Sequence, residues 1–187
     1  MNSPEKADVR QRLIAAATDV IAEGRHTSMP LRTVAERAGA TTGAIQHHFG
    51  NRDGLLLAVL QRHGERAVNR LRARRKAELP PPPQVARAIL MEFLPLDDER
   101  REESLVAHAF EGIAAGDGEM ASAYRAQHAG LANLLAEHLP GTKSADVDLV
   151  LAAVGGLRTD LLLHRIGNAQ AVDLLDHLIA TFTQEPT

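Results

Sequence analysis

The sequence contains no cysteine and no tryptophan, and its aromatic residues are four phenylalanines and one tyrosine. Without cysteine the chain has no disulfide, no thiolate metal ligand and no cysteine nucleophile. No apolar run approaches the roughly 20 residues that a membrane-spanning helix needs. The first residues, MNSPEKADVRQR, also lack the apolar core of a signal peptide. These absences predict a globular protein of the cytoplasm with no membrane partner.

Acidic and basic residues are unevenly distributed along the 187-residue chain, whose formal net charge is −3. Residues 1–78 hold fourteen Lys and Arg against eight Asp and Glu, whereas residues 79–187 hold seven against sixteen. This asymmetry favours an anionic partner for the first part alone. The arginines between 62 and 76 have an alternative interpretation, in which they form a helix face exposed to solvent.

Almost the whole chain has the apolar periodicity of amphipathic helices, without convincing β-strand alternation. Glycine at 24, 39 and 50 is expected to end helices. The proline run 80–83 is expected to break the chain, because proline does not fit a helix interior. The pattern predicts an all-α fold of about nine helices, at 7–23, 31–38, a short segment after Thr41 or Thr42, 52–77, 84–95, 98–115, 119–139, 145–166 and 170–183.

Two short helices separated by Gly39 form a candidate helix-turn-helix, since glycine tolerates the positive φ of a sharp turn. The second of them has an apolar side at Ala44, Ile45 and Phe49. Small or planar hydrogen-bonding groups remain for its outer face, namely Thr42, Gly43, Gln46 and His47. A helix that lies in the major groove of DNA needs such a face.

The segment VAERAGATTGAIQHHFGNRDGLLLAVL, residues 34–60, resembles the tetracycline-repressor (TetR) family of bacterial regulators. The match extends over about residues 9–60 and agrees in order, spacing and flanking helices. Gln46 departs from the family pattern, which usually has tyrosine there, and Arg52 replaces a lysine. The resemblance and the helix pattern together predict DNA contacts at Arg32, Thr41, Thr42, Gly43, Gln46, His47, His48 and Arg52.

The resemblance implies a ligand-responsive regulator, most often a repressor, that binds a near-palindromic double-stranded DNA operator as a homodimer. A small molecule, whose identity the sequence does not give, would release it. We expect a DNA-binding domain at 1–55 and a ligand-binding and dimerisation domain at 56–187, bridged by helix 52–77. Residues 93–103, FLPLDDERREE, further resemble the C-terminal domain of the betaine-regulator subgroup.

The expected domain at 56–187 contains candidate residues for both dimerisation and ligand binding. The helix at 145–166 is apolar on more than one face and must be buried by something. Together with 170–183 it predicts a dimer interface at Leu151, Val154, Gly155, Leu162, Leu174 and Leu178, unless the two helices bury each other within one chain. Polar or adaptable side chains on apolar stripes suggest effector contacts at Met91, His108, Phe110, Met120, Tyr124, His128, Leu157 and His164.

Two other functional classes fit the sequence less well. A di-iron helical bundle needs Glu-x-x-His pairs, and the chain contains none, nor any phosphate loop or HExxH motif. His47 and His48 are adjacent on a helix and point about 100° apart, which disfavours a shared metal ion. We therefore predict no catalytic residues, metal or cofactor. A helical small-molecule-binding or interaction protein that does not read DNA remains the alternative.

Overall fold

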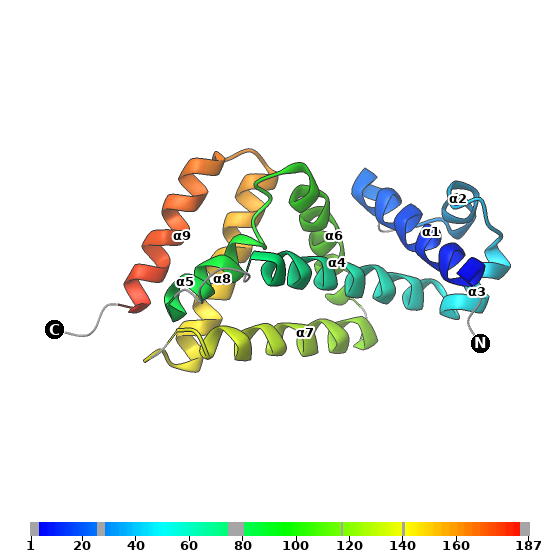
Figure 1. Ribbon diagram of the computed structural model, residues 1–187. Helices are drawn as coiled ribbons and strands as arrows, with labels where there is room; N and C mark the ends of the chain where they lie inside the picture. Colours follow the sequence, from blue (N-terminus) through cyan, green and yellow to red (C-terminus); the bar gives the residue numbers. More distant parts are fainter. Residues whose placement is uncertain (1–3, 26–28, 75–80, 117, 140, 184–187) are drawn as a thin grey trace. The chain divides into compact units, whose positions relative to one another are not determined.

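The computed structural model describes residues 4–25, 29–74, 81–116, 118–139 and 141–183, and every regular element in these ranges is helical (Figure 1). The predicted all-α fold is therefore confirmed. In chain order the elements are α1 (Pro4–Val20), the π-helical turn η1 (Ile21–Arg25), α2 (Leu31–Arg37), α3 (Thr42–Phe49), α4 (Arg52–Arg74), α5 (Pro82–Met91), α6 (Asp98–Ala114), α7 (Gly118–Ala136), α8 (Ser144–Leu162) and α9 (Asn168–Thr183).

Several predicted boundaries were wrong. Gly24 does not end the first helix, because the chain continues through η1 to Arg25. Helix α5 begins at Pro82 and ends at Met91, whereas 84–95 was expected. Proline is compatible with the first turn of a helix, where backbone N–H groups have no intrahelical acceptor. Helices α7 and α8 also end earlier than predicted, and residues 26–28 and 75–77 lie outside the described ranges.

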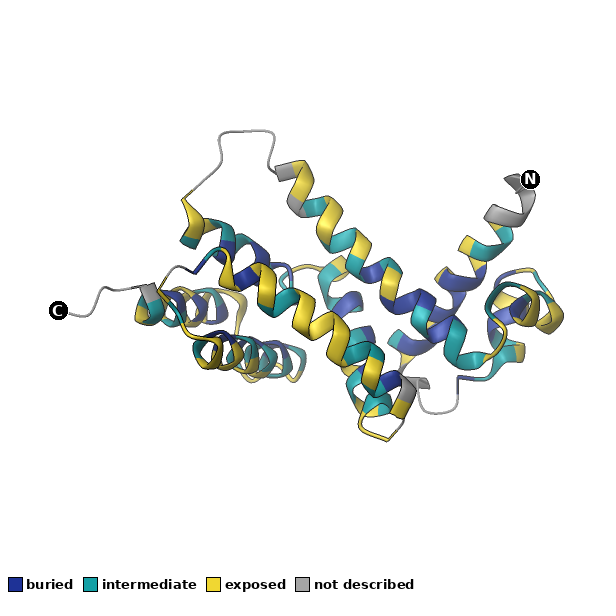
Figure 2. Cartoon of the chain, turned by 90° about the horizontal axis from the view of Figure 1, so that it is seen from below, coloured by how far each residue is buried: buried dark blue, intermediate teal, exposed yellow. Residues whose placement is uncertain are grey.

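The chain divides into two compact units, and unit 1 comprises residues 1–66 and 105–124. Its core is a single buried cluster, seen as dark blue ribbon in Figure 2, to which α1, α2, α3, α4 and α6 all contribute. Thr18 of α1 donates to the Ile14 carbonyl oxygen at 3.0 Å and lies 3.4 Å from Nε2 of His63 on α4. A buried polar contact thus accompanies the apolar packing of α1 on α4.

Unit 2 comprises residues 67–104 and 125–187. Its core joins α5, α8 and α9 with the last turns of α7, and α9 packs against both α5 and α8. Residues Leu90, Leu94, Leu135 and Leu175 are fully buried there. At the surface, Arg87 of α5 forms two hydrogen bonds to the Asp176 carboxylate of α9. These compact units do not test the predicted boundary near residue 55 between a DNA-binding and a ligand-binding domain, which stays a prediction.

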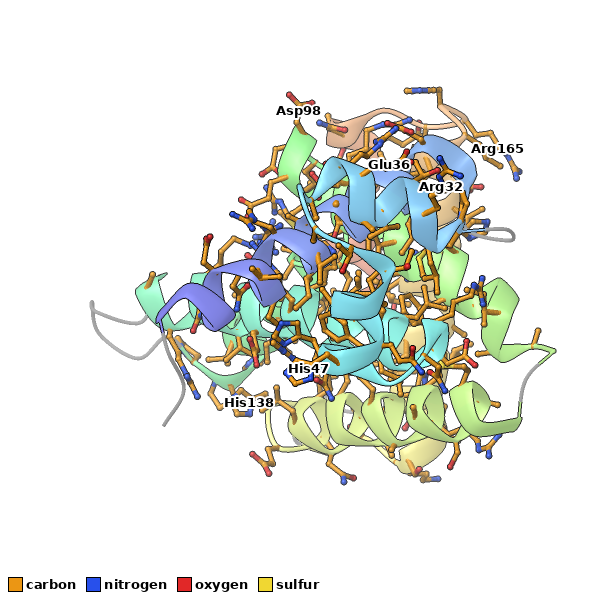
Figure 3. The ribbon with its side chains drawn as sticks, turned by 90° about the vertical axis from the view of Figure 1, so that its right-hand side faces the viewer. Arg32, Glu36, His47, Asp98, His138 and Arg165 are labelled. Atoms are coloured by element: carbon orange, nitrogen blue, oxygen red, sulfur yellow. The ribbon has the colours of Figure 1, made fainter. Side chains whose placement is uncertain are left out.

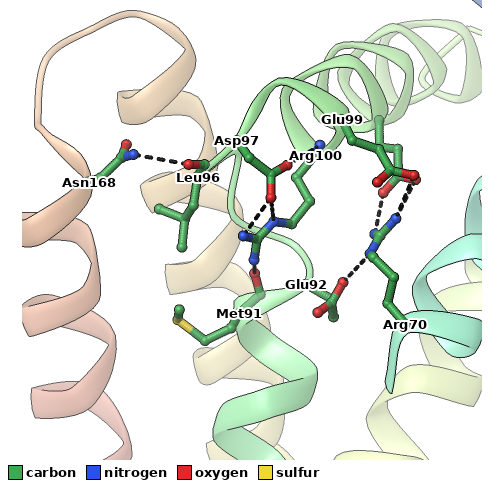
Figure 4. Close-up of polar contacts among 9 residues, drawn as sticks. Arg70, Met91, Glu92, Leu96, Asp97, Glu99, Arg100 and Asn168 are labelled. Atoms are coloured by element: carbon green, nitrogen blue, oxygen red, sulfur yellow. Dashed lines mark hydrogen bonds and ion pairs between the residues drawn. The ribbon is translucent and has the colours of Figure 1, made fainter. Parts of the chain in front are cut away.

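Unit 2 also contains a nearly buried ion cluster around Arg70 of α4 (Figure 4). The Arg70 guanidinium donates from Nε to Glu92 at 2.6 Å and from both terminal nitrogens to Glu103 at 2.9 and 2.5 Å. Glu99 lies 3.3 Å away. The Glu92 side chain is 0% exposed and that of Glu103 is 10% exposed. The hydrogen bonds with Glu103 contribute most to raising the Arg70 pKa above its ordinary value.

Asp97 lies next to this cluster and immediately precedes α6. Its carboxylate accepts the backbone N–H of Arg100 at 2.8 Å and the Arg100 Nε at 2.9 Å, contacts drawn in Figure 4. These hydrogen bonds hold the pKa of Asp97 below its usual range. Asp97 therefore caps α6. The Arg100 guanidinium also donates a hydrogen bond to the Met91 carbonyl oxygen at 3.2 Å. The connection between α5 and α6 is consequently held by side chains.

The arginines of α4 are not one solvated face. Arg62 donates to the backbone and the side chain of Gln11 on α1, and Arg70 holds the ion cluster of unit 2. Arg72 is exposed. The side chains of residues 74–76 lie outside the described part of the structure. Arg62 and Arg70 of this helix thus form polar contacts within their own units.

Candidate nucleic-acid interface

The turn between α2 and α3 is built from one glycine and one threonine. Gly39 adopts φ +59°, and Ala40 donates its N–H to the Ala35 carbonyl oxygen at 2.9 Å, which closes the end of α2. Thr41 then caps the N-terminus of α3, because its hydroxyl oxygen accepts the Ala44 N–H at 3.2 Å. The predicted turn and cap of the helix-turn-helix are therefore both present.

Helix α3 has the two faces that the sequence predicted. Ile45 is buried in the unit 1 core, with Ala44 and Phe49 partly buried beside it. Thr42, Gly43, Gln46 and His47 are all exposed on the other side. Figure 3 shows His47 at the surface of this short helix. The exposed side offers small or hydrogen-bonding groups, which suits close approach to the edges of DNA bases.

Three rings lie in succession at the end of α3. The imidazole centroids of His47 and His48 are 5.1 Å apart in an edge-to-face arrangement, and the Phe49 centroid is 6.1 Å from that of His48. His48 is half-buried while His47 is exposed. His47 is thus the more accessible of the two predicted histidine contacts, and His48 packs beside Phe49.

Arg52 and Arg32 flank α3 on its neighbouring helices. Arg52 is the first residue of α4, is partly exposed, and lies 3.4 Å from the Asp53 carboxylate. Arg32, on α2, has a side chain that is 87% exposed and donates to Glu36 at 2.8 Å (Figure 3). That hydrogen bond raises the pKa of Arg32 above its ordinary value. Both guanidinium groups are placed where a phosphate could replace an exposed carboxylate as acceptor.

The predicted effector contacts are divided between the two units. Phe110 and Met120 are buried in the core of unit 1, and Met91 and Leu157 are packed against the core of unit 2. His128 and His164 are exposed. Tyr124 donates to Glu111 at 2.7 Å, and Nδ1 of His108 is 3.6 Å from the same carboxylate. Glu111 is not among the predicted effector contacts, and its spacing of three residues from His108 places both on one helix face.

The predicted dimer contacts lie on α8 and α9. Leu151, Gly155, Leu162 and Leu178 are partly buried, Val154 is buried, and Leu174 is 42% exposed. Leu149 and Leu163 of the same region are 56% and 62% exposed. A Cβ atom added at Gly155 or Gly156 would meet no atom within 4 Å beyond its chain neighbours and the nearby backbone of its own helix. Helices α8 and α9 therefore bury each other only in part, and apolar surface remains on both.

Within the described ranges, no three His, Asp or Glu side chains gather in a way that could hold a metal ion. No described helix is long and apolar enough to cross a membrane.

Comparison with known proteins identifies the family that this chain resembles. Residues 13–59 match the family model described as bacterial regulatory proteins of the tetR family. The transcriptional regulator PksA of Bacillus subtilis (strain 168) is 30% identical over 163 residues, which cover 83% of this chain and 78% of that protein. The matched range contains α2, α3 and the exposed face described above.

Solved structures agree with this likeness over almost the whole chain. A transcriptional regulator from Rhodococcus sp. RHA1 superposes with a TM-score of 0.82 at 28% identity, covering 95% of this chain and 99% of that one. The multidrug binding protein EbrR, solved in complex with ethidium, gives a TM-score of 0.67 at 26% identity, with 91% and 98% covered. The resemblance of residues 93–103 to the betaine-regulator subgroup stays a prediction.

Proposed function

The chain belongs to the TetR family of bacterial regulatory proteins, and we propose that it is a cytoplasmic repressor that binds a near-palindromic operator as a homodimer. The observation that carries the proposal is the exposed face of α3, with Gln46 and His47 pointing away from a helix that is anchored by Ile45. In a two-fold dimer, two such helices enter successive major grooves about 34–36 Å apart. Repression follows if the bound dimer blocks transcription.

The groups around α3 divide the work of recognition. Thr42, Gly43, Gln46 and His47 face the bases, and the amide of Gln46 can pair with an adenine edge. Thr41, His48, Arg32 and Arg52 lie where they can meet phosphates, and a guanidinium can bind a phosphate through two parallel hydrogen bonds. Phosphate contacts fix the register of the protein on DNA, and base contacts supply the sequence preference.

A small molecule is the proposed release signal. EbrR, with a similar fold, was solved with ethidium bound, which supports a ligand role for the helical body of this chain. The ligand weakens DNA binding by preferring a conformation whose two α3 helices are wrongly spaced, and its differential affinity sets the size of that effect. The polar cluster of His108, Glu111 and Tyr124 is the best-defined candidate contact.

The DNA interface is tested by replacing His47 and Arg52 with alanine. We expect the double variant to bind operator DNA at least about tenfold more weakly, because one good base contact alone is worth about 1–3 kcal/mol. Both side chains are at least partly exposed, so the circular-dichroism melting curve should change little. Fluorescence anisotropy with a duplex enriched by the wild-type protein measures the affinity.

Arg165→Ala is the matched control, since it removes one equally charged and 68% exposed side chain from unit 2. It is expected to leave DNA affinity within about twofold of wild type. Equal losses in both variants would indicate nonspecific electrostatics. Unchanged binding by the double variant would favour the alternative, a helical ligand-binding or interaction protein that does not read DNA through α3.

The homodimer is tested at Leu174, on α9. Leu174→Glu places a charge in the proposed interface, and we expect the chain, of 20.2 kDa, to change from a dimer to a monomer in analytical ultracentrifugation. Leu134→Glu is the control, because Leu134 of α7 is similarly exposed, at 39%, and lies outside the predicted interface. A wild-type monomer, or a dimer that survives Leu174→Glu, would contradict the proposed interface.

A further inference from the structure

Arg10 of α1 lies directly beside the recognition helix. Its guanidinium carbon is 5.4 Å from the centroid of the Phe49 ring, at the last residue of α3. Phe49 is followed by the rings of His48 and then His47, at 6.1 and 5.1 Å between successive centroids. A continuous row of four side chains thus joins α1 to the exposed face of α3.

Arg10 differs from several other arginines in the described part of unit 1, which pair with carboxylates. Arg12 pairs with Asp8, Arg37 forms two hydrogen bonds with Glu23, and Arg52 lies against Asp53. For Arg10, the Phe49 ring is the one partner recorded among the described residues. An aromatic ring attracts the positive charge of a guanidinium without accepting conventional hydrogen bonds from it, as a carboxylate would. The five N–H groups of the guanidinium therefore remain available as donors to another acceptor.

The Phe49 ring that Arg10 contacts is itself packed into unit 1. The phenylalanine packs against the core of unit 1 and its ring is only partly buried. Arg10 is itself half-buried. An arginine that is already ordered by a ring loses less rotamer freedom when it binds a phosphate than a fully exposed arginine does.

We propose that Arg10 is a DNA-phosphate contact that extends the protein–DNA interface from α3 onto α1. This inference rests on the proposed function, since it needs α3 to lie in the major groove. The ligand is a phosphodiester of the backbone bordering that groove, and its oxygens accept from the guanidinium. Arg10 supplies affinity and register, and base preference stays with Gln46 and His47.

The test compares Arg10→Ala with Arg12→Ala on the same selected duplex across a salt series. Each phosphate contact contributes about 0.9 to the slope of log K against log salt concentration. With one Arg10 in each protomer, Arg10→Ala should reduce the magnitude of that negative slope by about 1.8 and weaken binding about tenfold or more at low salt. Arg12→Ala removes the same charge from the same helix, but from a residue paired with Asp8, and should behave as wild type.

Arg10→Lys guards against a folding artefact, because lysine keeps the positive charge and most of the methylene chain. It should retain the wild-type slope, with weaker binding since it loses the guanidinium fork. If Arg10→Ala keeps the wild-type salt slope and DNA affinity, the proposed Arg10 contact is wrong and the proposed function is unaffected. The same holds if Arg12→Ala loses as much slope and affinity as Arg10→Ala. A wild-type protein without sequence preference would overturn the proposed function as well.

Discussion

Gly54→Ala is expected to unfold the helix-turn-helix part of unit 1. Gly54 lies in the first turn of α4, where its N–H donates to the Asn51 side chain at 2.8 Å. A Cβ atom at this position would lie 2.0 Å from the Phe49 carbonyl oxygen and 3.1 Å from its carbonyl carbon. Backbone atoms cannot rotate away as a side chain does, so the junction of α3 and α4 must open. We expect a loss of more than about 4 kcal/mol, measured by urea denaturation followed by circular dichroism at 222 nm.

Gly43→Ala provides the matched control for the same substitution. An added Cβ at Gly43 would lie 3.6 Å from the Thr41 hydroxyl oxygen, which is an ordinary contact. Alanine in a helix is also more favourable than glycine by about 1 kcal/mol of folding free energy, so the stability of the protein should be kept or raised. DNA binding should nevertheless weaken, because Gly43 is exposed on the face proposed to approach the bases. A Gly54→Ala protein with wild-type stability would show that the tight α3–α4 junction is wrong.

Arg70→Met should produce the second large effect, a loss of about 3–5 kcal/mol. The substitution keeps an unbranched apolar chain and removes the cation from two carboxylates that are almost wholly buried, Glu92 and Glu103. Buried carboxylates that lose the Arg70 guanidinium are less well compensated for the cost of leaving water. Urea denaturation at pH 7 measures the loss.

Arg87→Met is the control, because Arg87 pairs in a similar bidentate way with Asp176 but at the surface, where the two side chains are 39% and 45% exposed. Exposed pairs contribute about 0–1 kcal/mol. Replacing Arg70, Glu92 and Glu103 together with apolar residues should recover much of the lost stability. Equal losses at Arg70 and Arg87 would contradict the role assigned to burial in the Arg70 cluster.

The recognition helix could be predicted from the sequence because its determinants are local. A left-handed Gly39, a capping Thr41 and the apolar spacing of Ala44, Ile45 and Phe49 all lie within eleven residues, and the structure has each of them as expected. The family resemblance added the predicted DNA contacts, most of which are exposed residues in the structure.

The contacts between distant segments could not be predicted in this way. Arg70 meets carboxylates 22 and 33 residues further along the chain, and nothing in its own helix indicates which acids it will reach. Phe110 and Met120 lie in the core shared with α1 and α4, which a helical stripe in the sequence does not reveal, and their role as effector contacts stays a prediction. Arg10 was not singled out, since its stacking on Phe49 depends on how α1 packs against α3.

The most direct measurement is selection of bound sequences from a random pool of duplex DNA by the purified wild-type protein, followed by sequencing. We expect enrichment of a near-palindrome whose half-sites are about one helical turn apart, because two α3 helices of a symmetric dimer contact successive major grooves. Recovery of the starting pool, with binding that depends on salt and not on sequence, would contradict the claim that this α3 face reads DNA.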